Sequence, residues 1–273
     1  MNLVRGVVLG SILHFLLIPV CSGLAVAEPI VLDGLVEPSL VVNVGSSVPG
    51  ILETLIAERG DMVKKGQVLA RLQSGVEKAT MALAKARAEM EAPIKVKQER
   101  LEYSKRQVKR TEELYNKKAI PFSQLDEVVT GQILADAELQ EAIENKRLAQ
   151  LELKRSSEVV KRLTIRSPIT GVVMERFLSQ GEYVEDRPIL KIARINPLYV
   201  EIIAPVEMLG AIKVGMRAEV RPEAPVSKSY PAKVTIVDQV VDAASGTFGI
   251  RLRLPNPDYR LPAGLKCRVV FPD

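Results

Sequence analysis

The residue types that perform most enzyme chemistry are nearly missing from this chain of 273 residues. Its one histidine, His14, lies in an N-terminal apolar stretch, and its two cysteines are Cys21 and Cys267. A chain without imidazole in its main body cannot form a Ser-His-Asp triad, a Cys-His pair or a His-ligated metal site. We therefore expect a protein that is not an enzyme and that holds neither a metal nor a cofactor.

The composition also argues against recognition of nucleic acid. The chain has no Trp, and aromatic residues make up only 4% of it, so surfaces on which bases could stack are scarce. The formal net charge of +5 is small for a chain of this length, whereas a nucleic-acid-binding protein usually has a concentrated basic face. We expect no nucleic-acid partner.

Residues 1–27 have the pattern of an export signal. Arg5 gives the positive start, residues 7–20 the apolar stretch, and residues 25–27 the small-x-small cleavage site. The alternative is an uncleaved membrane anchor, because the uncharged stretch is about long enough to span a bilayer. We favour cleavage, since Pro19 suits the end of a signal better than a spanning helix.

The residue composition of the chain changes twice along its length. Residues 30–72 are rich in Val and alternate with Gly and Pro, which is typical of strands and turns. Residues 76–162 are rich in Ala, Glu, Lys and Leu and poor in Gly and Pro, which is typical of long helices. The strand texture then returns and persists to residue 271, so the sequence predicts a helical insert between two β segments.

The two β segments that flank the insert share one spacing of glycines and apolar residues. Each half reads as a strand, a turn and a strand, with glycines where the backbone needs a positive φ. Two such halves would pair to bury their apolar faces. The residues that match at one constant offset are Gly50 and Gly171, Gly60 and Gly181, Val63 and Val184, and Leu69 and Leu190.

The insert reads as an antiparallel helical hairpin with its turn near residues 119–122. Ser123 is placed to cap the second helix, with Asp126 and Glu127 in the first turn of that helix. Pro93 should kink the outgoing helix or divide it into two pieces. With about forty residues in each arm, the hairpin would project roughly 60 Å.

Apolar residues recur every seven positions on both arms, which is the spacing of a coiled-coil seam. Charge supports the same pairing, because residues 95–118 hold nine basic and four acidic residues, whereas residues 124–145 hold six acidic and no basic ones. The ladders are Ile94, Leu101, Val108 and Tyr115 on the outgoing arm, and Leu125, Leu139, Leu153 and Val160 with Val128, Ala135, Ala142, Ala149 and Leu163 on the returning arm.

The paired halves resemble the biotinyl/lipoyl carrier fold, whose halves meet at a hairpin that bears a modified Lys beside a Met. That hairpin is absent here, because residues 72–75 lead directly into the helical insert. Lys78 lies nearby, but a lone Lys at the start of a helix is usually solvated surface. The resemblance therefore implies the fold without the carrier function.

The whole mature chain resembles the periplasmic adaptor subunits, or HlyD-like membrane fusion proteins, of tripartite RND-type efflux pumps. The hairpin tip, with Arg110-x-x-x-Leu114 followed by residues 119–126, is similar to the signature with which that family docks an outer-membrane channel. The tail is similar to the family's β-barrel domain through Gly-Met-Arg-Ala-Glu-Val (215–220), Val-Asp-x-x-Ser-Gly-Thr-Phe (241–248) and the Asn-Pro-Asp and Leu-Pro-Ala-Gly-Leu stretches (256–265).

The resemblance implies a mixed β fold with a long α-helical hairpin: a split lipoyl-like β-sandwich with an inserted antiparallel coiled coil, followed by a β-barrel. Since the chain stops at Asp273, we expect the membrane-proximal domain of longer members to be absent or rudimentary. The expected division is signal peptide 1–27, N-terminal strand segment 28–43 on the barrel side, first lipoyl-like half 44–74, hairpin 75–162, second half 163–195 and barrel 196–273.

The resemblance also implies a site and partners. Arg110, Leu114 and a nearby Ser would dock the channel; counting from Arg110, Pro121 occupies the family's Ser position, and Ser123 follows two residues later. The protein would lie in the periplasm of a Gram-negative bacterium, associated with the inner membrane. It would assemble into a ring that links an inner-membrane transporter, of RND type, to an outer-membrane channel. The alternative is a self-associating structural coiled-coil protein of the cell envelope, in which Arg110 is a solvated charge and Leu114 flanks the seam.

Overall fold

The computed structural model describes residues 1–2, 30–224 and 228–272. The export signal that we expect at residues 1–27 therefore lies almost entirely outside the described residues. Within the described part of the chain, no helix combines the length and the apolar character that crossing a membrane requires.

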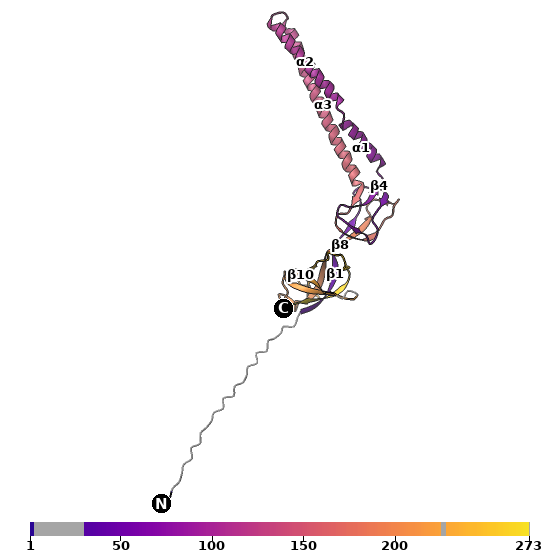
Figure 1. The fold of residues 1–273 in the computed structure, drawn as a ribbon, viewed down its shortest axis with the longest axis vertical. Helices are drawn as coiled ribbons and strands as arrows, with labels where there is room; N and C mark the ends of the chain where they lie inside the picture. Colours follow the sequence, from indigo (N-terminus) through magenta and orange to yellow (C-terminus); the bar gives the residue numbers. More distant parts are fainter. Residues whose placement is uncertain (3–29, 225–227, 273) are drawn as a thin grey trace.

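Two β modules and a helical hairpin follow one another along the long axis of the molecule (Figure 1). The barrel that contains β10 lies at one end, the module around β4 lies in the middle, and the hairpin projects from that middle module. The helices are α1 (Gly75–Ala88), α2 (Ala92–Asn116), α3 (Phe122–Arg162) and the short 3-10 helix η1 (Val206–Met208). The strands are β1 (Ile30–Val44), β2 (Gly50–Leu55), β3 (Met62–Val63), β4 (Val68–Leu72), β5 (Thr164–Arg166), β6 (Gly171–Arg176), β7 (Tyr183–Val184), β8 (Leu190–Pro205), β9 (Arg217–Pro222), β10 (Tyr230–Val237), β11 (Thr247–Leu254) and β12 (Lys266–Phe271).

Six antiparallel strands form the closed barrel, in the order β1-β12-β9-β10-β11-β8, and β8 pairs back with β1. Side chains along β9 and β12 alternate between buried and exposed, as expected when one face of a sheet lines a core. The thiol of Cys267 is part of this core, and burial, with smaller effects from Asp33 and Glu223, raises its pKa to about 11. Because the thiolate is the reactive form, Cys267 is a packing residue rather than a nucleophile.

The barrel and the middle module share two long strands instead of a linker. Strand β1 has 15 residues and β8 has 16. Their antiparallel register runs from Gly34 opposite Ile202, in the barrel, to Val44 opposite Leu190, in the core of the middle module. One irregularity interrupts it between Pro38 and Leu40. The same pair of strands therefore orients both modules.

The middle module is a sandwich in which each sequence half supplies a strand to the other. Strand β2 of the first half pairs with β7 of the second, with Gly50 opposite Val184. Strand β6 of the second half pairs with β3 of the first, with Gly171 opposite Val63. The two halves thus pair across the helical insert, and both Val63 and Val184 are fully buried between them.

Backbone hydrogen bonds repeat this exchange at the turn glycines. The Gly60 N–H donates to the Val173 carbonyl at 2.9 Å, and the Gly181 N–H donates to the equivalent Leu52 carbonyl at 2.8 Å. The values of φ at Gly60 and Gly181 are 93° and 89°, a region that side chains with a Cβ rarely adopt. These two glycines are therefore required by their turns.

The other two matched glycines, Gly50 and Gly171, do not have a positive φ, so our expectation of turn conformations there is wrong. Gly171 is instead required by a close approach, since a Cβ at this position would lie 2.1 Å from the Ala193 carbonyl oxygen of β8. At Gly50 a Cβ would meet only the flexible Leu72 side chain, at 3.3 Å.

The outgoing arm of the hairpin consists of two helices, α1 and α2, that both run along α3 (Figure 1). The division falls at Pro93, which lies in the first turn of α2, where its missing N–H leaves no hydrogen bond unmade. Helix α3 is continuous over 41 residues, which corresponds to about 60 Å. The seam follows the seven-residue ladders, and its most buried members include Leu101, Val108 and Ala135.

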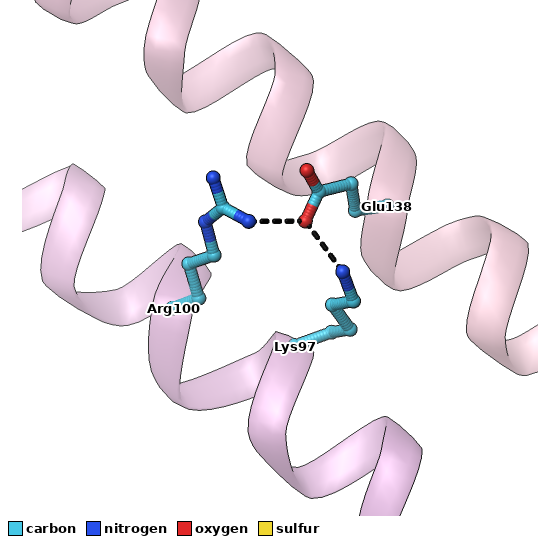
Figure 2. A network of polar contacts seen from close by, with 3 residues as sticks. All are labelled: Lys97, Arg100 and Glu138. Carbon is cyan, nitrogen blue, oxygen red and sulfur yellow. Dashed lines mark hydrogen bonds and ion pairs between the residues drawn. The ribbon is translucent and has the colours of Figure 1, made fainter.

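Ion pairs across the hairpin fix the register of the two arms. The Glu138 carboxylate of α3 accepts hydrogen bonds from Lys97 at 2.8 Å and Arg100 at 2.9 Å (Figure 2). Nearer the sandwich, Lys146 donates to Glu91. The hydrogen bond from Lys97, with smaller contributions from the charges of Arg100 and Lys97, lowers the pKa of Glu138 against the effect of desolvation. The pairs are placed symmetrically about the turn, as the charge pattern of the sequence predicts.

We expect Gly171→Ala to destabilise the sandwich by about 3 kcal/mol or more, because the new methyl group overlaps main-chain atoms that cannot rotate away. Urea denaturation of the purified protein measures the change. Gly45→Ala is the control: its Cβ would meet the nearest atom, the Arg187 carbonyl oxygen, at an ordinary 3.6 Å. Its effect should stay within about 1 kcal/mol. Equal losses in the two variants would contradict this account of Gly171.

We expect Glu138→Gln to lower the melting temperature of the hairpin at neutral pH. Since folding lowers the pKa of Glu138, its contribution is present above the usual carboxylate pKa and disappears as pH falls through the lowered value. Circular dichroism of both proteins from pH 7 to pH ~2.5 should show the two melting temperatures converging.

The control for that experiment is Glu144→Gln, whose partner Arg147 lies on the same helix at 3.5 Å. It should have a smaller effect, because a pair within one exposed helix stabilises only weakly. A difference between wild type and Glu138→Gln that persists at the lowest pH would show that the ion pairs are not its cause.

Candidate functional site at the hairpin tip

The tip is built by a hydrogen-bonded ending of α2. The Ala119 N–H donates to the Leu114 carbonyl at 3.0 Å, and the Lys118 N–H donates to the Tyr115 carbonyl at 2.8 Å. Lys118 has a φ of 58°, in the left-handed region. This is the Schellman arrangement, in which a left-handed residue reverses the chain and satisfies the last helical carbonyls.

The start of α3 differs from the sequence expectation. Pro121 is the N-cap, with φ −68° and ψ 157°, and Ser123 is the second residue of the helix, without a capping hydrogen bond. Our prediction that Ser123 caps the helix is therefore wrong, and Asp126 and Glu127 lie beyond its first turn. The fixed φ of proline suits the extended N-cap conformation, so the helix begins before Ser123.

The side chains that the sequence singles out at the tip are all open to solvent. Arg110 and Leu114 lie one helical turn apart on α2, so they share one face. Leu114 is 46% exposed, and Arg110 is exposed and has no ion-pair partner among the described residues. Pro121 and Ser123 are exposed at the start of α3.

An aromatic pair at the turn was missed by the sequence reasoning. The rings of Tyr115 and Phe122 meet edge to face, with centroids 6.0 Å apart and an interplanar angle of 64°. Tyr115 is the last member of the predicted seam, but it is 37% exposed and packs on Phe122, which is itself 62% exposed. The signal for this pair was one aromatic residue, Tyr115, shortly before the predicted turn and another, Phe122, at its end.

The tip therefore presents a guanidinium, an aliphatic side chain and an exposed aromatic ring at the end of a rod. A guanidinium can donate to carbonyl or carboxylate groups in a planar fork, and the apolar side chains can pack against a partner. The described residues contain no group of three or more His, Cys, Asp or Glu side chains placed to hold a metal ion. The arrangement suits contact between proteins.

Two family models cover most of the chain. Residues 40–194 match the CzcB-like barrel-sandwich hybrid domain, and residues 197–273 match the CusB-like β-barrel domain. The first match spans the sandwich and the hairpin, and the second spans the barrel strands β9 to β12 with most of the barrel part of β8.

Curated relatives are distant but share much of the chain. The cobalt-zinc-cadmium resistance protein CzcB of Cupriavidus metallidurans is 24% identical over 217 residues, which cover 79% of this chain and 39% of CzcB. The membrane fusion protein MtrC of Neisseria gonorrhoeae is 26% identical over 267 residues, which cover 90% of this chain and 60% of MtrC. The chain thus spans well under two thirds of the length of these relatives.

Among solved structures, MacA from Actinobacillus actinomycetemcomitans has the same fold, with a TM-score of 0.74 at 23% identity over 90% of this chain and 79% of MacA. Members of the matched family are non-catalytic adaptors of efflux pumps. The match to the first family model extends over more than half of the sequence. The chain therefore belongs to the membrane fusion proteins that carry a CzcB-like barrel-sandwich hybrid domain.

Proposed function

We propose that this chain is a periplasmic adaptor that links an inner-membrane transporter to an outer-membrane channel in a tripartite efflux system of a Gram-negative bacterium. The observation that carries the proposal is the tip itself, with its exposed cationic and apolar side chains about 60 Å from the sandwich. A rod of this length buries little beyond its own seam, so its use is to reach a distant partner.

The barrel supports contact with the transporter at the other end of the molecule. The family model that matches it is of RND type, and we therefore assign the transporter to the RND class. The association with cobalt, zinc and cadmium resistance is a property of CzcB. The hairpin tip and the barrel do not identify the compound that this system exports.

A second apolar ladder of the hairpin, on α1 and on the break that follows it, is exposed. Val76, Leu83 and Met90 recur every seven residues and are 78%, 55% and 55% exposed. Contact with another molecule would bury these exposed apolar side chains. The ladder supports side-by-side assembly of adaptor copies into a ring.

At the tip, Arg110 donates hydrogen bonds to the channel and Leu114 packs beside it, with Phe122 as an additional apolar contact. Pro121 sets where α3 begins, and Ser123, one residue further along than Phe122, supplies a hydroxyl. The alternative, a structural coiled-coil protein of the envelope, requires only the exposed ladder and assigns no partner to Arg110.

A photo-cross-linking amino acid in place of Phe122 tests the proposal in cells. It should capture an outer-membrane channel protein, identified by mass spectrometry. Arg110→Asp should reduce that capture at least about tenfold, because the reversed charge removes the donor and repels the carboxylate or carbonyl groups that it contacts. Tolerance to the exported compound should fall in parallel.

Two controls test whether the loss of channel capture is specific to the hairpin tip. Lys154→Asp makes the same charge change at an exposed position of α3 far from the tip and should leave capture unchanged. A cross-linker at Leu148, which is 62% exposed on the middle of α3, should capture other copies of the chain. Capture of only further copies at position 122, with Arg110→Asp behaving as wild type, would favour the structural alternative.

A further inference from the structure

Three cations stand in one row across neighbouring strands of the barrel. Lys233 of β10 is directly opposite Arg217 of β9 and directly opposite Arg253 of β11. All three side chains are exposed on the outer face of the barrel. Like charges at directly opposed positions destabilise a sheet, so this row lowers the stability of the barrel that carries it.

Two carboxylates on strands of the same barrel, Glu219 and Glu201, bind other side chains. Glu219, the next outward residue of β9, accepts hydrogen bonds from Arg221 at 3.1 Å and Ser229 at 3.3 Å. Glu201 of β8 is bound by Arg251. No ion pair to Arg217, Lys233 or Arg253 occurs within residues 30–224 and 228–272. The positive charges of the three side chains are therefore not neutralised by an ion pair within the described residues, and they are available to a ligand.

An apolar groove accompanies the row. It has a volume of about 690 Å³, within the range of small-molecule sites. Its apolar lining includes Pro231, Pro255 and Val214, whose side chain is 64% exposed. The three cations line the same groove, so one ligand can meet charged and apolar surface together.

The strands below the groove are interior strands of the closed barrel. β9 pairs with β12 and β10, β10 pairs with β9 and β11, and β11 pairs with β10 and β8. An added peptide strand would find no free backbone edge here, so recognition must use charge and apolar contact alone. A groove of this size suits a single chain-like molecule.

We propose that this groove binds a single-chain amphiphile with an anionic head group. The head lies on Arg217, Lys233 and Arg253, where charge-assisted hydrogen bonds replace the mutual repulsion of the cations. The hydrocarbon chain lies along Pro231, Pro255 and Val214. The site is far from the hairpin tip, so it and the proposed docking role can fail separately.

Titration calorimetry of the purified full chain with dodecanoate, below the concentration at which it forms micelles, tests the site. Wild type should bind, Lys233→Ala should weaken binding about tenfold, and the triple alanine variant of the row should abolish it. Val214→Asp should also weaken binding by charging the apolar wall. The melting temperature of Lys233→Ala should equal or exceed that of wild type, since repulsion is removed.

Lys266→Ala, which removes an exposed cation from β12 of the same barrel, is the matched control and should bind as wild type. Dodecyl maltoside has the same chain with an uncharged head and should bind at least about tenfold more weakly. The proposal is overturned if wild type does not bind dodecanoate, if Lys266→Ala weakens binding as much as Lys233→Ala, or if dodecyl maltoside binds equally well. Binding confined to phosphatidylglycerol vesicles would likewise overturn it in favour of a membrane surface.

Discussion

The reciprocal hydrogen bonding between the two halves of the sandwich is the constraint on which the architecture depends. Gly60 donates to Val173 and Gly181 donates to Leu52, while the N–H groups of Val173 and Leu52 donate back to Asp61 and Glu182. Each half is incomplete without the other, although the helical insert of residues 75–162 separates them in the chain. The exchange holds the two ends of that insert together, so the helices leave and return side by side.

The sandwich also sets the direction of the hairpin, which projects away from the barrel. Because β1 and β8 run without a break from one β module into the other, the direction of the hairpin is set by paired strands and not by a loop. The hairpin tip, the sandwich and the barrel are therefore parts of one extended molecule (Figure 1). The paired strands thus fix the position of the hairpin relative to the barrel.

Features that repeat along the sequence, such as the matched halves and the charge pattern of the two arms, could be predicted. Features that depend on which of several neighbouring residues takes a position could not. The constant offset between the halves predicts their pairing. The charge asymmetry of the arms predicts that a basic and an acidic stretch lie side by side, and the contact of Glu138 with Lys97 and Arg100 is one instance. The N-cap of α3 was predicted wrongly because Pro121, whose fixed φ suits the extended N-cap conformation, takes this position instead of Ser123. The close approach at Gly171 and the groove on the barrel depend on strands distant in sequence, which spacing alone does not reveal.

The rod is not equally stiff in all directions. One side is the uninterrupted α3, and the other is broken between Ala88 and Ala92, where the Lys146–Glu91 pair is the ionic contact that joins the two sides. Because no helical hydrogen bonds of the outgoing arm cross this break, we expect bending of the hairpin to be concentrated there. A rod built in this way should bend more readily in the plane that opens and closes the gap than in the plane across it.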